Sequence, residues 1–346
     1  MSEWKEYKLG DVATLNYGKA LKAQDRIEGN VPVYSSAGIT GYHNTALINS
    51  KGLIVGRKGT IGKIYKSDIP FYCIDTAYYI LPDDKIHNFE FLYYSLQTLG
   101  LEELNSDSAV PGLNRNAAYE QEIYLPPLPE QKAIASVLSS LDDKIDLLHR
   151  QNQTLEQMAE TLFRQWFVEE ADEGWEEGVL GDVIELHYGK GLKKKDRTGS
   201  GFSVVGSSGI VDYHSAFLVE GPGIVIGRKG TLGKVIYLWD NFYPIDTTYC
   251  VKSKVDSIGL LYEYFLLKTI NFEEMNTDSA VPGLNRDIAL STDIRIAPEN
   301  LLHDFNELAS AFIKKMKNNQ TQIHTLEKMR DTLLPKLMSG EVRVEI

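Results

Sequence analysis

The chain has 346 residues, a formal net charge of −12 and two cysteines, Cys73 and Cys250. This length exceeds what one small core needs and suits two domains with connecting helices. No run of about 18 apolar residues occurs and no apolar signal segment follows Met1, so we expect neither membrane insertion nor export. Two cysteines make no disulfide framework and no zinc site, which favours a reducing cytoplasm.

The acidic charge is unevenly distributed. Residues 128–173 carry 4 basic and 10 acidic groups, whereas residues 1–127 carry 12 and 15, and residues 174–298 carry 13 and 16. An acidic chain argues at first against nucleic acid, but each of the two larger segments keeps local basic clusters. Total charge therefore neither supports nor excludes a DNA-binding surface.

Residues 1–127 read as an α+β domain with many loops. Short runs of β-branched and aromatic residues, bounded by Gly, Asn and Asp, predict strands at 31–34, 53–55, 61–65, 71–80 and 123–125. Residues 88–104 have apolar positions at helical spacing and predict one amphipathic helix capped by Asn88.

A basic loop near the start follows Tyr17 and contains Lys19 and Lys22. Lysines beside an aromatic residue suit contacts to a nucleic-acid backbone, although a solvated turn is the more usual explanation.

The strongest chemical candidate is the loop Gly56-Arg-Lys-Gly-Thr-Ile-Gly-Lys63, between two predicted strands. Glycines let the backbone approach a ligand, while Arg57, Lys58, Thr60 and Lys63 offer contacts to phosphates or, for arginine and lysine, to guanine. The loop is not a nucleotide-binding P-loop, which would need glycine at 57 and Ser or Thr at 64. The alternative is a tight hairpin with solvated charges.

Asn114 and Arg115 follow a Pro-Gly turn. Asn and Arg are the residues that read adenine and guanine, but Asn at this place is also a usual cap or turn residue. For Tyr42-His43 and for Asp75, a lone carboxylate without a partner base, a structural role is the better interpretation. No methyltransferase tetrad, glycine-rich cofactor motif or metal-ligand spacing is present, so the sequence predicts no enzyme, no cofactor and no metal site.

Residues 128–170 predict a long helix with one apolar seam. Stepping alternately four and three residues from Ile134 gives a heptad pattern through Leu141, Ile145, Leu148, Asn152 and Leu155. About forty residues at about 1.5 Å each make a rod of roughly 60 Å. A single helix of this kind needs a partner helix in water.

The second half repeats the first at a displacement of 171 residues. Residues 171–298 form a second domain, residues 299–340 a second helix and residues 341–346 a tail. The displaced candidates are Lys190, Lys193, Arg228, Lys229, Thr231, Lys234, Asn285 and Arg286, and the second seam includes Met316, Asn319, Ile323 and Leu326. The period is far beyond that of solenoid repeats, so this is a domain duplication.

The two helices are expected to pack antiparallel as an intramolecular coiled coil, because a domain intervenes and the duplication implies a pseudo-twofold axis. Placing Asn152 opposite Asn319 lets the two polar seam residues satisfy each other, and it also pairs Trp166 with Phe305.

Four motifs resemble one known family. Leu125–Ala135, Leu141–Ile145, Gln153–Met158 and Thr332–Glu341 are similar to the conserved regions of type I restriction-modification specificity subunits. The resemblance covers the whole chain and implies two target-recognition domains, each followed by a conserved helix.

The resemblance implies a non-catalytic, cofactor-free protein that reads a two-part target on double-stranded DNA. Its partners would be two adenine-methylating subunits and then restriction-translocation subunits, while its helices would set the length of the unread spacer. Since the two domains match at their candidate DNA loops, we expect similar half-sites in inverted orientation. The alternative is a protein-binding scaffold that dimerises through its long helices.

Overall fold

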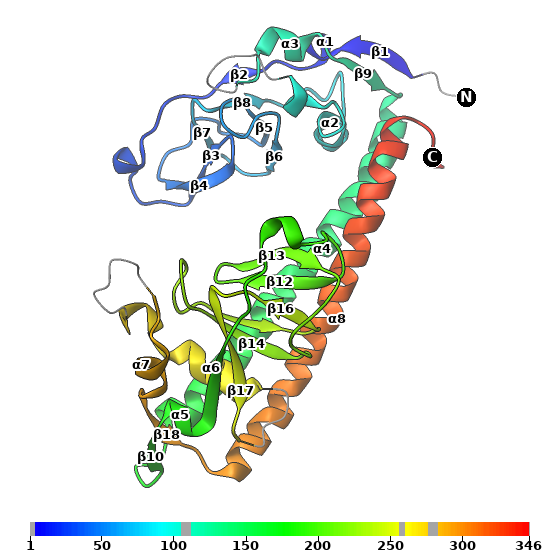
Figure 1. Cartoon of the computed structure of the whole chain (residues 1–346). Helices are drawn as coiled ribbons and strands as arrows, with labels where there is room; N and C mark the ends of the chain where they lie inside the picture. The colour runs from blue at the N-terminus through cyan, green and yellow to red at the C-terminus, as the bar shows by residue number, and fades with distance from the viewer. Residues whose placement is uncertain (1–3, 105–111, 256–259, 276–282, 346) are drawn as a thin grey trace. The chain divides into compact units, whose positions relative to one another are not determined.

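The computed structural model describes residues 4–104, 112–255, 260–275 and 283–345. The chain divides into two compact units, residues 1–147 with 323–346, and residues 148–322. Each unit combines one mixed α/β body with a stretch of both long helices (Figure 1). The fold class expected from the duplication is confirmed.

The described part of the first unit's body contains three small sheets, whose strands are at most six residues long. A two-stranded sheet pairs β1 with β9, a four-stranded sheet has the order β2-β8-β5-β6, and a three-stranded sheet has the order β4-β3-β7, with β3 and β7 parallel. The strands are β1 (Lys5–Lys8), β2 (Asn16–Tyr17), β3 (Val31–Ser35), β4 (Gly38–His43), β5 (Gly52–Gly56), β6 (Ile64–Ser67), β7 (Tyr72–Cys73), β8 (Ala77–Ile80) and β9 (Glu122–Leu125).

The helices of this body are short. They are α1 (Leu9–Val12), α2 (Phe89–Leu96) and α3 (Arg115–Tyr119), with single turns η1 (Ala23–Asp25) and η2 (Leu101–Glu103). Asn88 caps α2 as predicted, because its side chain accepts a hydrogen bond from the Phe91 amide at 3.0 Å. Phe89, Phe91 and Leu92 on α2 are buried in the core of the unit.

Three sequence predictions were wrong in extent. The predicted strand 61–65 begins only at Ile64 and runs to Ser67 as β6, because residues 61–63 belong to the preceding loop, where Gly62 has a left-handed conformation, φ 69°. The predicted strand 71–80 is two strands, β7 and β8, because residues 74–76 form a turn between them. The predicted helix 88–104 ends at Leu96, and Gly100 then takes a left-handed conformation, φ 62°, before the separate turn η2. Left-handed residues end a helix, and glycine adopts that conformation without strain.

The second unit repeats this body in the same order. Its strands are β10 (Glu176–Val179), β11 (Ile184–Tyr188), β12 (Phe202–Gly206), β13 (Gly209–His214), β14 (Gly223–Gly227), β15 (Val235–Leu238), β16 (Phe242–Pro244), β17 (Thr248–Ser253) and β18 (Asp293–Ile296). They form the sheets β10-β18, β11-β17-β14-β15 and β13-β12-β16. The helices and turns are α5 (Leu180–Val183), η4 (Lys194–Asp196), α6 (Leu261–Thr269), η5 (Phe272–Met275) and α7 (Arg286–Leu290).

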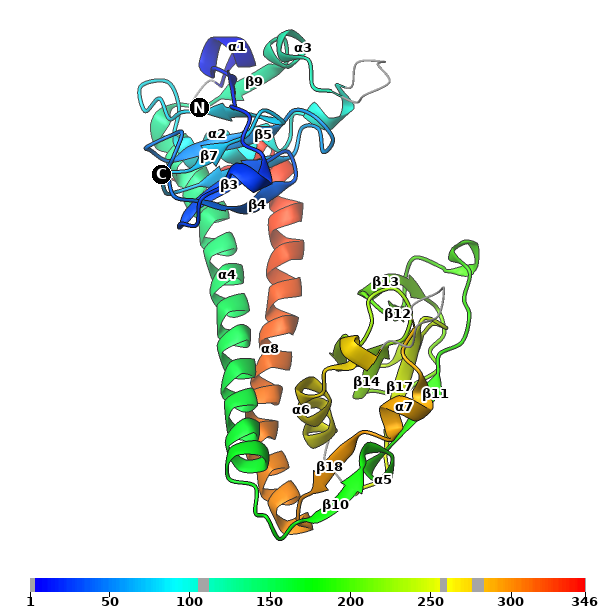
Figure 2. The ribbon, with the colours of Figure 1, turned by 90° about the vertical axis from the view of Figure 1, so that its left-hand side faces the viewer.

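The two long helices are α4 (Leu128–Arg164), which continues into a π-helical turn, η3 (Gln165–Glu169), and α8 (Glu299–Met338). In each unit they lie side by side (Figure 2). Both units bury part of the predicted seam, which includes Ile134, Leu138 and Leu337 in the first and Ala159, Phe305 and Ala309 in the second. Among the other seam residues, Ile145, Leu148, Asn319 and Ile323 are buried, whereas Leu141, Asn152, Leu155, Met316 and Leu326 are half-buried.

The predicted antiparallel register is confirmed in the second unit. Asn319 donates from Nδ2 to Oδ1 of Asn152 at 2.9 Å, and Asn152 donates to the Met316 carbonyl at 3.4 Å. Trp166 lies fourteen residues after Asn152, in the π-helical turn that follows α4. Its ring centre is 6.2 Å from that of Phe305, which lies fourteen residues before Asn319. Since the position on α4 rises while that on α8 falls, the helices run in opposite directions.

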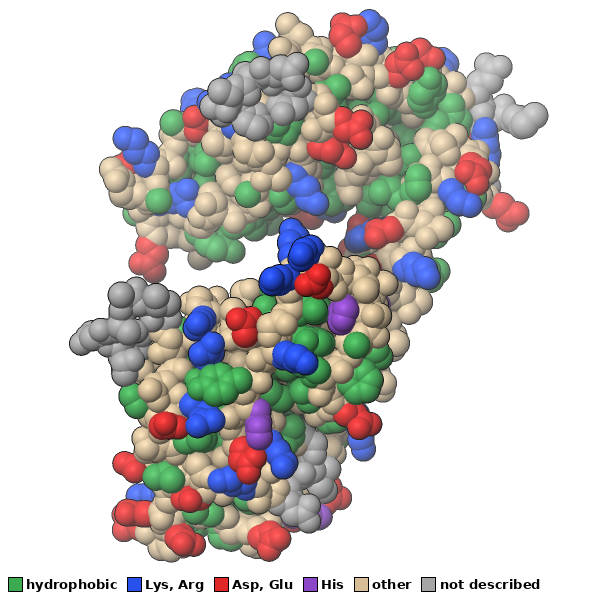
Figure 3. Space-filling model, viewed as in Figure 1, with side chains coloured by type: hydrophobic (Ala, Val, Ile, Leu, Met, Phe, Trp, Pro, Cys, Tyr) green, Lys and Arg blue, Asp and Glu red, His purple; other side chains and the backbone are tan. Residues whose placement is uncertain are grey.

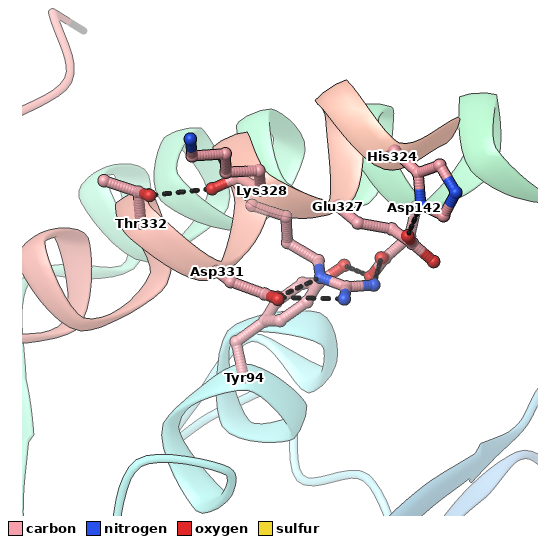
Figure 4. Close-up of polar contacts among 8 residues, drawn as sticks. Tyr94, Asp142, His324, Glu327, Lys328, Asp331 and Thr332 are labelled. Carbon is pink, nitrogen blue, oxygen red and sulfur yellow. Dashed lines mark hydrogen bonds and ion pairs between the residues drawn. The ribbon is translucent and has the colours of Figure 1, made fainter. Parts of the chain in front are cut away.

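In the first unit, a polar cluster joins the body to both long helices (Figure 4). Asp142 on α4 accepts a hydrogen bond from the Tyr94 hydroxyl of α2 at 2.6 Å. It also forms an ion pair with Arg330 of α8 at 2.9 Å. Arg330 also contacts Asp331 at 2.9 Å. Burial, followed by the bond to Asp142, raises the pKa of Tyr94, so its hydroxyl remains a donor.

Candidate nucleic-acid interface

In the first unit, the turn between β7 and β8 holds the candidate loops together. The Thr76 carbonyl accepts hydrogen bonds from the amides of Arg57 and Lys58 at 2.9 and 3.0 Å. The Thr76 hydroxyl oxygen accepts from the Ser36 amide at 3.3 Å. The loop after β5 and the turn between β3 and β4 are thus fixed to the same point.

The basic loop after Tyr17 packs on this turn backbone to backbone. The Lys19 amide donates to the Cys73 carbonyl at 3.0 Å. A Cβ at Gly18 would lie 2.1 Å from the Ile74 carbonyl oxygen, so only glycine allows this approach.

Three segments that are distant in sequence meet at Tyr17. The guanidinium carbons of Arg57 and Arg115 each lie 4.9 Å from the centre of the Tyr17 ring. We call Tyr17, Arg57 and Arg115 the Tyr–Arg cluster of the first unit. Tyr17 remains 48% exposed, and Arg57 is fixed by a hydrogen bond from Nη1 to the Asp75 carbonyl at 2.9 Å. The cluster therefore presents a fixed positive surface with an accessible aromatic ring.

A buried tyrosine supports the cluster from below. The rings of Tyr17 and Tyr78 lie 5.1 Å apart, and the Tyr78 hydroxyl donates to the Leu113 carbonyl at 3.2 Å. The Leu113 amide in turn donates to the Arg57 carbonyl at 2.8 Å. These bonds hold the chain that leads into Arg115.

The second unit contains the same arrangement, which we call the Tyr–Arg cluster of that unit. Arg228 and Arg286 lie 5.2 and 5.5 Å from the centre of the Tyr188 ring, and Arg228 donates to the Asp246 carbonyl at 2.8 Å. Tyr188 is 56% exposed.

The support beneath it is repeated as well. The Tyr249 ring lies 5.1 Å from that of Tyr188, and its hydroxyl donates to the Leu284 carbonyl at 2.9 Å. Burial raises the pKa of Tyr249 to about 12, which keeps this donor protonated at neutral pH.

The other predicted contact residues surround the clusters. Lys19, Lys22, Lys58, Thr60 and Lys63 have exposed side chains, as do Lys190, Lys193, Lys229, Thr231 and Lys234 in the second unit. Lys234 is held by a hydrogen bond from Nζ to the Ser208 carbonyl at 2.8 Å. Figure 3 shows Lys and Arg side chains exposed on the viewed face of the second unit.

Asn114 and Asn285 act as helix caps, the alternative weighed from sequence. Oδ1 of Asn114 accepts from the amides of Asn116 and Ala117 at 2.8 and 3.2 Å. Asn285 caps α7 in the same way. Reading adenine would need this oxygen, so a base contact from either residue would compete with its cap.

The structural interpretation of Tyr42-His43 is supported for the histidine, whose Nδ1 accepts from the Ile27 amide at 3.0 Å. Asp75 does hold the turn region, but through its backbone carbonyl and not its carboxylate. The repeated segments 107–111 and 278–282 lie outside the described residues.

Among the described residues, no cluster of His, Cys, Asp or Glu could hold a metal ion. No helix in the same part of the chain has the length and apolar character needed to span a membrane.

Comparison with known sequences identifies the family. The sequence model described as "Type I restriction modification DNA specificity domain" matches residues 1–157 and, in a second copy, residues 172–328. The chain belongs to the type I restriction-modification specificity family. As a member, this specificity subunit is non-catalytic, and its family binds DNA and assembles with other subunits.

Relatives of this specificity subunit carry the same designation. The type I restriction enzyme MjaIX specificity subunit of Methanocaldococcus jannaschii is 29% identical over 313 residues, covering 77% of this chain and 72% of the relative. The HindI specificity subunit of Haemophilus influenzae is 27% identical over 194 residues, covering 49% of this chain and 42% of the relative.

The fold also has a solved counterpart. The crystal structure of a type I restriction-modification S subunit from M. genitalium superimposes with a TM-score of 0.64 at 20% sequence identity, covering 100% of this chain and 97% of the other. This chain therefore shares its fold with a solved S subunit.

Sequence reasoning missed the centre of the candidate site. It paired Tyr17 with the neighbouring lysines, whereas the structure places Arg57 and Arg115 on its ring. The available signal was the intact duplication of all three residues as Tyr188, Arg228 and Arg286.

Proposed function

We propose that this subunit reads a bipartite DNA target, one half with each unit, and brings adenine-methylating and then restriction subunits to that target. The observation that carries the proposal is the repeated Tyr–Arg cluster. Two arginines beside an exposed tyrosine can bind phosphate or guanine, and the tyrosine ring can stack on a base. The surrounding exposed lysines supply phosphate contacts.

The half-sites are proposed to be similar and inverted, a near-palindrome with a gap. This follows from the repetition of the same three cluster residues and of their supports: Tyr78 and Tyr249 hold equivalent segments with equivalent bonds. The clusters differ in that Arg286 also contacts Asp287 at 3.4 Å, where the first unit has Asn116 beside Arg115. Mapping of methylated adenines in the host genome tests it, and two unrelated half-sequences would contradict it.

Removal of the fixed guanidinium groups tests the interface. We expect the double variant Arg57→Ala with Arg228→Ala to lose specific binding by about 100-fold or more, since each arginine contact contributes about 1–3 kcal/mol. Lys85→Ala is the matched control, because Lys85 is an exposed cation beyond the other end of β8. The measurement is a gel shift of the target duplex with the full chain and its methyltransferase partner.

Lys193→Ala separates phosphate contacts from sequence reading. Loss of the Lys193 ammonium group is expected to reduce the slope of log affinity against log salt by about 1, while the preference for the target sequence stays unchanged. Equal and small effects of all three substitutions would show that these loops face away from the duplex. Failure of the wild-type complex to shift any duplex would favour a protein-binding scaffold instead.

A further inference from the structure

A carboxylate lies at the centre of each proposed DNA surface. Asp75 and Asp246 lie two residues after the ends of β7 and β16, in the turns that hold the Tyr–Arg clusters, and both side chains are exposed. Neither carboxylate has a hydrogen bond or an ion pair within the part of the chain that the structure describes.

The nearest described cation of each turn is bound to its backbone and not to the carboxylate. Arg57 and Arg228 use their guanidinium groups on the backbone carbonyls of Asp75 and Asp246, not on the side chains. A Cβ at Gly191 would lie 4.0 Å from Cγ of Asp246, so this carboxylate sits against the lysine-rich loop. Each carboxylate thus has its full capacity to accept hydrogen bonds.

Holding the turn does not require the carboxylate. The bonds that fix the neighbouring loops end on backbone carbonyls of residues 73–76 and 244–247 and, in the first unit, also on the Thr76 hydroxyl, and none of them uses a carboxylate oxygen. Removal of the side-chain charge should therefore leave the turn in place.

On a surface that faces DNA, phosphates repel an unpaired carboxylate. It becomes favourable only where the duplex offers a hydrogen-bond donor. In the major groove, the donors are the amino groups of cytosine and adenine. Adenine and guanine also present N7, an acceptor that repels a carboxylate, whereas the cytosine edge presents N4 alone.

Resting on the function proposed above, we propose that Asp75 and Asp246 are specificity-determining residues, each accepting a hydrogen bond from N4 of a cytosine in its own half-site. The arginines of the cluster supply attraction to DNA, and the aspartate makes that attraction depend on the base. Since the same residue occurs in both units, a cytosine is expected at the equivalent position of both halves.

The test is a half-specific change of the methylated motif. Asp75→Asn and Asp246→Asn are introduced singly into the subunit in its host, and methylated adenines are mapped. The exchange removes the charge and preserves the shape. Each variant is expected to relax one cytosine position by about 5- to 140-fold, which corresponds to about 1–3 kcal/mol, and to leave the other half-motif intact.

Asp84→Asn is the matched control, because Asp84 is exposed in the loop that follows the far end of β8. Selection of duplexes from a random library by the purified complex gives a second measurement that does not need methylation. There, both Asp75→Asn and Asp246→Asn should bind random DNA at least as tightly as the wild type, because a charge repelling phosphate is gone.

The outcomes are distinct. A wild-type complex with no bipartite motif would sink the proposed function itself. A wild-type bipartite motif that either lacks these cytosines or stays unchanged in both variants would overturn only the role of the aspartates. Loss of all binding by correctly folded variants would likewise overturn it, since it would assign these residues to affinity and not to base selection.

Discussion

At the scale of single residues, the candidate site depends on a few positions where chemistry and space leave no choice. Gly18 and Gly189 let a basic loop lie directly on the backbone of the central turn, and Arg57 and Arg228 are each oriented by one backbone carbonyl. The space at these glycines can be changed without changing any charge, so the two contributions can be tested separately.

We expect Gly189→Ala to destabilise the chain by about 2 kcal/mol and to weaken DNA binding, because the added Cβ would lie 2.1 Å from the Ile245 carbonyl oxygen. Gly191→Ala is the control in the same loop, where the nearest atom is 4.0 Å away. Urea unfolding of both variants measures the difference. Equal stabilities would mean that the loop moves off the turn at no cost.

His87 gives a prediction about pH. The residue is 1% exposed, and both ring nitrogens lack a hydrogen-bond partner within the described structure. Burial, opposed by nearby Asp83, lowers its pKa below the usual value of about 6.5. Below that pH the unfolded chain takes up a proton that the folded chain resists, so stability falls as the pH falls.

The measurement is the urea midpoint between pH 7.5 and 5.5. His87→Gln should have a flatter dependence than the wild type, whereas His149→Gln, at an exposed histidine of α4, should keep the wild-type slope. Parallel curves for all three proteins would exclude His87 as a source of the pH dependence.

At the scale of elements, polar contacts decide how the helices meet. The Asn152–Asn319 pair fixes the register of α4 on α8 in the second unit, and Asp142 joins α2, α4 and α8 in the first. Apolar seams alone permit more than one register, whereas a buried polar pair is satisfied in only one.

Asp142→Ala is expected to lower the free energy of unfolding by about 2–3 kcal/mol, because it leaves the largely buried Tyr94 hydroxyl and the Arg330 guanidinium without their shared acceptor. Asp143→Ala removes the neighbouring carboxylate, which is exposed, and should change stability by less than about 0.5 kcal/mol. Denaturant unfolding of the full chain compares them, and similar losses would contradict the role given to Asp142.

At the scale of the whole molecule, each unit contains one recognition body and a part of both long helices. A change in the length of one helix therefore requires a matching change in the other. If the helix pair sets the unread spacer, as the family resemblance implies, its length should be reflected in the DNA target.

Insertion of one heptad after Leu147 and one after Gln322, where the two units meet along the chain, should add about 10 Å of helix. At about 3.4 Å per base pair, the gap in the methylated motif should lengthen by about three base pairs. Insertion in α4 alone is the control and should abolish methylation, because the seams no longer match. A methylated motif with an unchanged gap would refute the spacer role.

The sequence by itself determined the duplication, both long helices, their antiparallel register and the basic loops. These follow from periodicity and from repeated segments, which are local or paired signals: Asn152 and Asn319 could be matched by arithmetic alone. The ends of strands and helices were harder to predict. The turn at 74–76 divides a predicted strand, and the left-handed Gly100 lies within a predicted helix, although both sequence patterns read as continuous.

Only the tertiary structure decided which of these residues act together. Tyr17, Arg57 and Arg115 are far apart in sequence, and no spacing rule joins them. The pairing of β2 with β8, the bonds of Arg57 to the Asp75–Thr76 turn and the Leu113–Arg57 bond bring them to one place. The folded chain also leaves the Asp75 and Asp246 carboxylates exposed, whereas Asn114 and Asn285 cap the helices that follow them. The chemistry of a side chain can be read from the sequence. Which of its hydrogen-bonding groups stay unpaired depends on the neighbours that folding brings to it.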